Sequence, residues 1–245
     1  DEEAMAELRR FLSYMPANNG VLPPEYDLVE DAAQEQDDIL EILPERQAKV
    51  YDMRKIIEII VDKGSFFEFK PRFGKAGTVG LARLNGKSVG IVANNPQFGG
   101  GALSQEACRK IIDFQVMCDS FNIPIVRFMD TPGFVVGTEA ERKGAPGWIM
   151  NFMNSSCLVT VPSITVIVRK AYGRAYVAMG GGRHNDEMIA WPTAEVSFMD
   201  PNFATSIVHG VDIGEEGFED ALADVQKDSA VWDMATIFSL QNIVK

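Results

Sequence analysis

The sequence predicts a mixed α/β fold, a spiral of stacked ββα units around a largely parallel sheet. Two observations predict it. From residue 66 onward, strand-like apolar runs alternate with helical segments, as expected for parallel strands joined by right-handed crossovers. In addition, no G-x-G-x-x-G follows the first strand and no G-x-x-x-x-G-K-[ST] occurs, so a flat nucleotide-binding sheet is disfavoured.

The first 50 residues predict a helical arm followed by an extended loop. Apolar residues recur at helical spacing over residues 2–14, at Met5, Leu8 and Leu12. Residues 16–44 are rich in proline, asparagine and acidic residues, which indicates an extended loop. A second amphipathic helix is expected over residues 53–63, ending at a glycine.

The repeating pattern then begins. Asn85-Gly86 marks a tight hairpin turn between two strands. Residues 164–168 are β-branched at every position, which indicates a buried interior strand. We expect strands at residues 66–69, 77–84, 87–93, 123–129, 163–168, 188–191 and 195–198, and helices at 104–121, 147–156 and 173–179.

Composition limits the classes of function. The 245 residues are 46% apolar and 24% charged, as in a soluble globular protein, and are long enough to bury a core. The net charge of -12 argues against a nucleic-acid partner and an anionic membrane surface. No apolar run is long enough to span a bilayer, so we expect a cytoplasmic protein, or a mitochondrial-matrix protein that has lost a presequence. The three cysteines lack metal-binding spacing, so no metal site is expected.

The most informative segment runs from the buried strand through Tyr172 and Gly173 into a helix of small residues. Free N–H groups at such a helix start stabilise negative charge that develops on an oxygen. Taken alone, this pattern favours an ordinary strand-to-helix turn without chemistry. A second glycine turn, Asp130-Thr131-Pro132-Gly133-Phe134, also follows an apolar strand, and the pair favours a functional site.

Several motifs in order resemble the carboxyltransferase β subunit of biotin-dependent acyl-CoA carboxylases, members of the crotonase-like superfamily. The resemblance covers most of residues 1–210 and concerns only the C-terminal half of that subunit. The motifs are Tyr51-Asp52-Met53-Arg54, Asn122-Ile123-Pro124-Ile125-Val126, Asp130-Thr131-Pro132-Gly133-Phe134, Gly137, Glu141, residues 164–176 and Ala190-Trp191-Pro192-Thr193-Ala194-Glu195.

The resemblance implies a crotonase-like spiral of ββα units with peripheral helices. Residues 1–245 would form the carboxybiotin-binding domain of a carboxyltransferase. This half-subunit would transfer a carboxyl group between biotin, held on a separate carrier, and an acyl-coenzyme A of acetyl, propionyl or longer type. Its partners would be the complementary N-terminal half, the biotin carboxyl carrier and biotin carboxylase, in an oligomer that is hexameric by resemblance.

The resemblance also assigns site residues. The backbone amides of Gly173, Arg174 and Ala175 would form the oxyanion site. Val177 occupies a position that lines the acyl pocket and is often acidic in enzymes with short-chain substrates, although packing in the core explains a valine equally well. The full set of expected biotin and substrate-pocket residues is Gly133, Phe134, Val135, Gly137, Tyr172 and Val177.

Departures from the family keep two alternatives open. Residues 144–148 lack the basic residue and the histidine usual there, and Arg174 replaces a small residue. A biotin-dependent acyl-CoA decarboxylase subunit, or a non-catalytic crotonase-fold assembly subunit, would also fit.

Individual side chains carry further expectations. His184 is either a proton shuttle or structural, and Asp130 is expected to bind local backbone amides. Arg174 is expected either to bind an anion or to form a surface salt bridge. The apolar residues Trp148, Phe152, Trp191 and Phe198 predict an oligomer interface.

Overall fold

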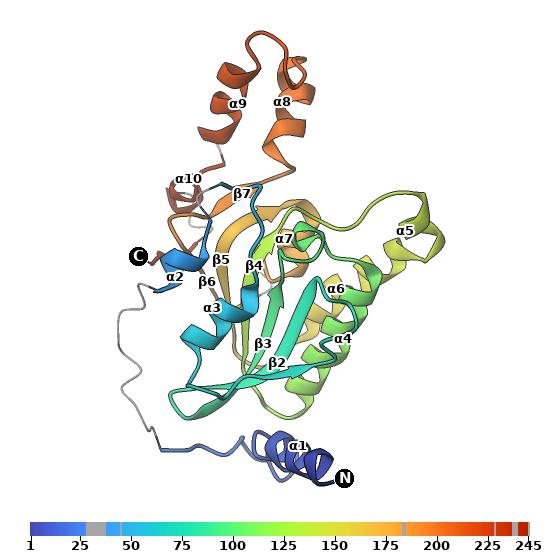
Figure 1. The fold of residues 1–245 in the computed structure, drawn as a ribbon, viewed down its shortest axis with the longest axis vertical. Helices are drawn as coiled ribbons and strands as arrows, with labels where there is room; N and C mark the ends of the chain where they lie inside the picture. Colours follow the sequence, from blue (N-terminus) through green and yellow to red (C-terminus); the bar gives the residue numbers. More distant parts are fainter. Residues whose placement is uncertain (28–37, 45, 183–184, 228, 237–239, 245) are drawn as a thin grey trace.

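The computed structural model describes residues 1–27, 38–44, 46–182, 185–227, 229–236 and 240–244. Over these ranges the chain forms one mixed sheet with helices on both faces, which confirms the predicted α/β class (Figure 1). The strand order is β1-β2-β3-β4-β5-β6-β8, and β7 pairs with β5. The strands are β1 (Phe67–Phe69), β2 (Gly77–Leu84), β3 (Lys87–Asn94), β4 (Ile125–Thr131), β5 (Ser163–Tyr172), β6 (Glu187–Ala190), β7 (Glu195–Ser197) and β8 (Asn242–Ile243).

The sheet is antiparallel at one side and parallel across the rest. Strands β1, β2 and β3 form an antiparallel meander, and the β2–β3 turn consists of Asn85 and Gly86 with φ of 53° and 76°. Two successive positive φ angles are the type I′ geometry that matches strand twist, so the predicted hairpin is confirmed. Strands β3, β4, β5, β6 and β8 then run parallel.

The other regular elements of the described residues are helical. They are α1 (Glu2–Leu12), α2 (Asp38–Ile42), α3 (Met53–Ile60), α4 (Gln105–Ser120), α5 (Thr138–Arg142), α6 (Ala145–Leu158), α7 (Gly173–Ala178), α8 (Pro201–His209), α9 (Phe218–Lys227) and α10 (Val231–Thr236), with a 3₁₀ turn, η1, at Gly99–Gly101. No helix among the described residues combines the length and apolarity needed to cross a membrane.

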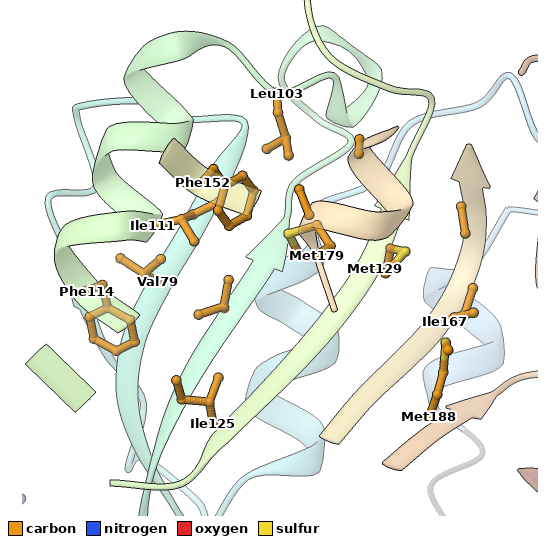
Figure 2. Packing of buried hydrophobic residues seen from close by; sticks show 14 of the residues in the cluster. Val79, Leu103, Ile111, Phe114, Ile125, Met129, Phe152, Ile167, Met179 and Met188 are labelled. Carbon is orange, nitrogen blue, oxygen red and sulfur yellow. The ribbon is translucent and has the colours of Figure 1, made fainter. Parts of the chain in front are cut away.

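Two apolar clusters lie on the two faces of the sheet, and β5 separates them. Ile167 and Ala171 of β5 join a cluster with residues of α4, α6 and α7, whose packing Figure 2 shows around Phe152, Met179 and Met129. Val166 and Val168 point the other way, into a cluster with α3. Because both faces of β5 are covered, its β-branched run is the interior strand that the sequence predicts.

Some expected boundaries are wrong. Residues 38–42, predicted as part of an extended loop, form α2, and β5 continues to Tyr172 and passes directly into α7. The arm helix α1 has no fully buried residue, but Phe11 packs against Phe67 and Phe69 of β1, so the end of the helix contacts this domain. Helices α8 and α9 form a hairpin that projects beyond the sheet at the end opposite α1 (Figure 1).

Candidate active site

The carboxyl ends of β4 and β5 bring the two predicted glycine turns to one edge of the sheet. Thr131 of β4 pairs with Ala171 of β5, so Gly133 and Gly173 each lie two residues beyond a paired position. Because the strands are parallel and adjacent, both turns leave the sheet side by side. Ligand sites in α/β proteins lie preferentially at this edge.

Gly173 makes the direct passage from strand to helix possible. Tyr172 is still extended, with φ of -107° and ψ of 139°, whereas Gly173 has φ of 58°. This left-handed conformation is easy for glycine and strained for residues with a side chain. The helix therefore starts abruptly, and its first N–H groups lie at this edge of the sheet.

The start of α7 has no side-chain cap among the described residues. The amides of Gly173, Arg174 and Ala175 belong to the first turn, where helical N–H groups have no partner within the helix. Ala175 is fully buried, whereas Arg174 is exposed and has no ion pair within the described part of the chain. A surface salt bridge, one of the two expectations for Arg174, is thus absent there.

The turn after β4 is held by hydrogen bonds within the turn, to η1 and to the segment after η1. The amide of Gly133 donates to Thr131 Oγ1 at 3.2 Å, and Thr131 Oγ1 donates to the Gly101 carbonyl at 2.9 Å. Leu103 N donates to the Gly133 carbonyl at 3.0 Å, and Val135 N donates to the Leu103 carbonyl at 2.9 Å. These hydrogen bonds hold the Gly133 turn in place at this edge of the sheet.

The predicted pocket residues differ in exposure. Phe134 is half-buried against the core, while Val135 and Gly137 are exposed, with Gly137 starting α5 at φ of 119°. Val177 is half-buried on α7. Tyr172 is buried beside Glu195, and burial, with a further contribution from that carboxyl, raises the pKa of its phenol above the usual range. Burial also raises the pKa of Glu195.

Asp130 makes a buried ion pair that the sequence did not predict. Its Oδ2 lies 2.8 Å from Arg169 Nε, and its Oδ1 accepts from the amide of Lys170 at 3.2 Å. The expectation of local backbone bonds is wrong because these partners lie on the neighbouring strand. Arg169 also donates to the Lys49 carbonyl at 3.2 Å and lies over the Tyr51 ring at 4.7 Å. The pair therefore ties β4, β5 and the segment before α3 together.

Other candidate residues lie away from this edge of the sheet or outside the described residues. His184 lies outside the described residues. His209 lies 3.9 Å from Asp224 and links α8 to α9. Phe152 is fully buried in the core, so its predicted role in an oligomer interface is wrong, whereas Phe198 is largely exposed. Among the residues that the structure describes, no cluster of three or more histidine, cysteine, aspartate or glutamate side chains could hold a metal ion.

The geometry therefore defines a class: an α/β protein that presents uncapped helix amides at the carboxyl edge of parallel strands. Residues 1–232 match the family model for the carboxyl transferase domain, and the chain belongs to that family. Its fold is the crotonase-like fold of the carboxyltransferases.

Three comparisons describe the relationship. The chain is 40% identical, over 91% of its length, to the carboxyltransferase subunit of propionyl-CoA carboxylase from Haloferax mediterranei, and covers 44% of that protein. It is 37% identical to methylmalonyl-CoA decarboxylase subunit alpha from Propionigenium modestum, over 87% of this chain and 41% of the relative. A transcarboxylase 12S crystal structure, described as a hexamer assembly with methylmalonyl-coenzyme A bound, matches 99% of this chain and 47% of its own at 32% identity and a TM-score of 0.93. The chain thus spans less than half the length of these relatives.

Proposed function

We propose that this chain is the carboxybiotin-binding half of an acyl-CoA carboxyltransferase. The observation that carries the proposal is the uncapped start of α7 beside the Gly133 turn, in a chain whose residues 1–232 match the carboxyl transferase domain. The relatives named for propionyl-CoA carboxylase and methylmalonyl-CoA decarboxylase support an acyl-CoA of short chain length as substrate.

In this proposal the chain's own groups act mainly through backbone amides. Amides fixed at a helix start stabilise a developing oxyanion without reorganisation, and need no ionisable side chain. The N–H groups of Arg174 and Ala175 would donate to the ureido oxygen of biotin, and Gly173 allows the close approach. Biotin, when bound, supplies the carboxyl group. These N–H groups suit the oxygen of a neutral ring, because no side chain of the described residues accepts a hydrogen bond at the start of α7.

The remaining site residues have positioning roles in this proposal. Gly133, Phe134 and Val135 would border the biotin pocket, with Gly137 at the start of the next helix, and Val177 would face the acyl group. Tyr172 would hold the end of β5 through its buried contact with Glu195, so that the turn at Gly173 keeps its place.

The proposed reaction needs partners that the chain does not contain. We propose the complementary acyl-CoA-binding half, a biotin carboxyl carrier and biotin carboxylase, because the relatives are more than twice as long as the matched segment. A hexameric assembly is supported by the description of the 12S structure. A cytoplasmic or mitochondrial-matrix location stays a prediction.

Transfer of label from carboxyl-labelled methylmalonyl-CoA to free biotin tests the proposal. The chain is combined with its complementary half, and each half alone serves as the control. We expect transfer only in the combined sample. Formation of a stable complex that transfers no label would contradict the proposal and favour the assembly-subunit alternative.

A decarboxylase is a second candidate, supported by the 37% identity to methylmalonyl-CoA decarboxylase subunit alpha. Both enzymes would share this half-reaction, so the label assay does not distinguish a carboxylase from a decarboxylase. Assays of the assembled complex distinguish them. ATP-dependent incorporation of bicarbonate into acyl-CoA indicates a carboxylase. Net release of CO2 from methylmalonyl-CoA without ATP indicates a decarboxylase.

A further inference from the structure

Three polar side chains, here called the serine network, connect α4 to α6 among the apolar residues of the core: Gln115, Ser155 and Ser156. Gln115 Nε2 donates to Ser155 Oγ at 2.5 Å and to Ser156 Oγ at 3.3 Å. Gln115 and Ser156 are both buried. Burying polar groups costs free energy that apolar side chains in the same space would not, even when the hydrogen bonds are made. This cost makes the network a candidate for a function beyond packing.

The serine network ends on α7. Ser156 Oγ donates to the Ala178 carbonyl at 2.8 Å, and the hydroxyl of Thr165 on β5 donates to the next carbonyl, that of Met179, at 3.3 Å. The last carbonyls of a helix have no partner within the helix, so these two hydroxyls hold the carboxyl end of α7. Ser156 has one hydroxyl proton. Because the Gln115 amide donates to the Ser156 oxygen, that proton is directed to Ala178.

The orientation of α7 depends on such contacts, because the helix has only six residues. A helix this short is unstable by itself in water, so tertiary contacts decide where it lies. It is about 9 Å long at 1.5 Å per residue. A displacement of its carboxyl end at Ala178 therefore reaches the amides of Arg174 and Ala175 at its start.

The serine network also connects to the other side of the candidate site. Helix α4, which carries Gln115, follows Leu103, and Leu103 exchanges hydrogen bonds with the turn at Gly133 and Val135. The network thus links, behind the site, the element next to the Gly133 turn with the helix that starts at Gly173.

We propose that Gln115 and Ser156 are positioning residues for carboxyl transfer, which act through the Ala178 carbonyl to fix the amides of Arg174 and Ala175. The proposal rests on the proposed function. Neither side chain touches the substrate. Their contribution is to hold the donors in the geometry of the reacting oxygen, and small misplacements of catalytic groups are costly in rate.

Three variants and one matched control test this role. Ser156→Ala removes the hydroxyl, Ser156→Thr keeps it, and Gln115→Met removes the amide that orients it. The control is Tyr14→Phe, which also removes one buried hydroxyl that donates to a distant carbonyl, that of Ser65. Tyr14 follows α1, which is well separated from α7 (Figure 1). Thermal unfolding followed by circular dichroism reports the stability of each variant.

The kinetic measurement is label transfer from carboxyl-labelled methylmalonyl-CoA to free biotin in the complex with the complementary half. We expect Ser156→Ala to lower kcat by about 10- to 100-fold. KM for methylmalonyl-CoA should stay within about twofold, because the lost interaction serves only the transition state. Ser156→Thr should restore most of kcat, and Gln115→Met should lie between Ser156→Ala and the parent. Tyr14→Phe should lose comparable thermal stability and keep the parent's kcat.

Turnover by Ser156→Ala equal to that of Tyr14→Phe would overturn the inference, because the network would then be only structural. If Ser156→Ala does not fold, Gln115→Met decides, and parental kcat in that variant would overturn it equally.

Hydrogen exchange separates this inference from the proposed function. In the chain alone, Ser156→Ala should speed exchange of the backbone amides of residues 173–179, and Tyr14→Phe should not. If the parent complex transfers no label, the proposed function fails. Unchanged exchange over residues 173–179 in Ser156→Ala would instead show that the network does not hold α7, and would overturn the inference whether or not label is transferred.

Discussion

At the scale of single residues, Gly173 decides whether strand β5 passes directly into α7. Its φ of 58° and the nearby Phe198 carbonyl leave little room for a side chain. We expect Gly173→Ala to lower the free energy of unfolding by about 1–2 kcal/mol, the usual cost of a residue held in a left-handed conformation. Urea denaturation measures this change in the free energy of unfolding.

Gly147→Ala is the matched control for this change. Gly147 lies inside α6 with open space around its Cβ position, so alanine should be neutral or stabilise by up to about 1 kcal/mol. If both variants changed stability equally, the left-handed turn would not be the constraint we describe.

Val177 is the residue expected to set acyl-chain preference. In the proposed pocket an apolar group should favour a longer or branched acyl chain, by roughly 1–3 kcal/mol per methylene. We expect Val177→Asp to shift kcat/KM toward acetyl-CoA relative to propionyl-CoA and longer thioesters in the assembled complex. An unchanged ranking would mean that Val177 packs in the fold without meeting substrate, the alternative that its half-buried position also allows.

Lys110 on α4 is a buried cation with no hydrogen-bond partner for its Nζ among the described residues. Burial lowers the pKa of its amine from 10.5 to about 8. Below pH 8 both folded and unfolded chains carry the proton, and the folded chain bears the cost of a buried charge. Between about pH 8 and 10.5 the folded chain binds fewer protons than the unfolded chain. The free energy of unfolding therefore rises with pH, relative to that of a variant with a neutral side chain at this position.

The matched test is Lys110→Met. We expect this variant to be more stable than the parent at pH 7, by about 1–3 kcal/mol, because it removes a buried unpaired charge. The difference should shrink as the pH approaches 10.5. A constant difference across this range, measured by urea denaturation, would show that the charge is not its cause.

At the scale of elements, the Asp130–Arg169 pair joins two strands to the segment before α3. Removing one partner from a buried pair typically costs about 3–5 kcal/mol. Lys170 Nζ lies 3.8 Å from Asp130 Oδ1 and offsets part of this cost. We therefore expect Arg169→Met to destabilise by about 3 kcal/mol, the lower end of that range, and to speed hydrogen exchange around Lys49 and Tyr51. Asp130→Asn in the same chain should recover part of the loss.

The exposed pair of Arg142 and Glu139, 2.7 Å apart on α5, provides the control. Arg142→Met should cost less than about 1 kcal/mol because surface ion pairs contribute little. Comparable costs at the two sites would mean that burial does not set the strength of the Asp130–Arg169 contact.

Elements with strong local signals could be predicted from the sequence. The β-branched run over residues 164–168 and the Asn85-Gly86 turn each combine residue types that suit one conformation, and both are confirmed. Helix α5 has five residues and no apolar period, so its sequence gives no comparable signal. Helices α9 and α10 lie in an acidic stretch, which indicates a solvated flank. The large apolar side chains of α8 are exposed, so its apolar pattern does not correspond to a contact with the core.

Contacts between distant residues could not be predicted in the same way. Nothing local distinguishes Arg169 from an exposed arginine, because its partner lies 39 positions earlier on the neighbouring strand. The two glycine turns were identified separately, but their meeting at one edge depends on strand order and register. The assignments of Gly173, Arg174 and Ala175 rest on the family resemblance and stay predictions.

At the scale of the whole molecule, the chain matches less than half the length of its relatives. It spans 44% of the Haloferax mediterranei relative and 47% of the 12S chain. Phe198 is largely exposed, and its carbonyl lies close to Gly173. These features support the proposal that the domain works in a larger assembly, in which the α7 amides meet a substrate bound by another part.

The central claim, that the α7 amides stabilise the reacting oxygen, is tested most directly by deleting one amide. Replacing Ala175 with its α-hydroxy acid analogue substitutes an ester oxygen for the N–H and keeps the methyl group. The same replacement at Ala6 in the exposed helix α1 controls for the chemistry. In the assembled complex, we predict that the Ala175 ester lowers kcat for carboxyl transfer on the order of 100- to 1000-fold, the typical loss for one oxyanion donor. Transfer within about threefold of the Ala6 control would contradict the account.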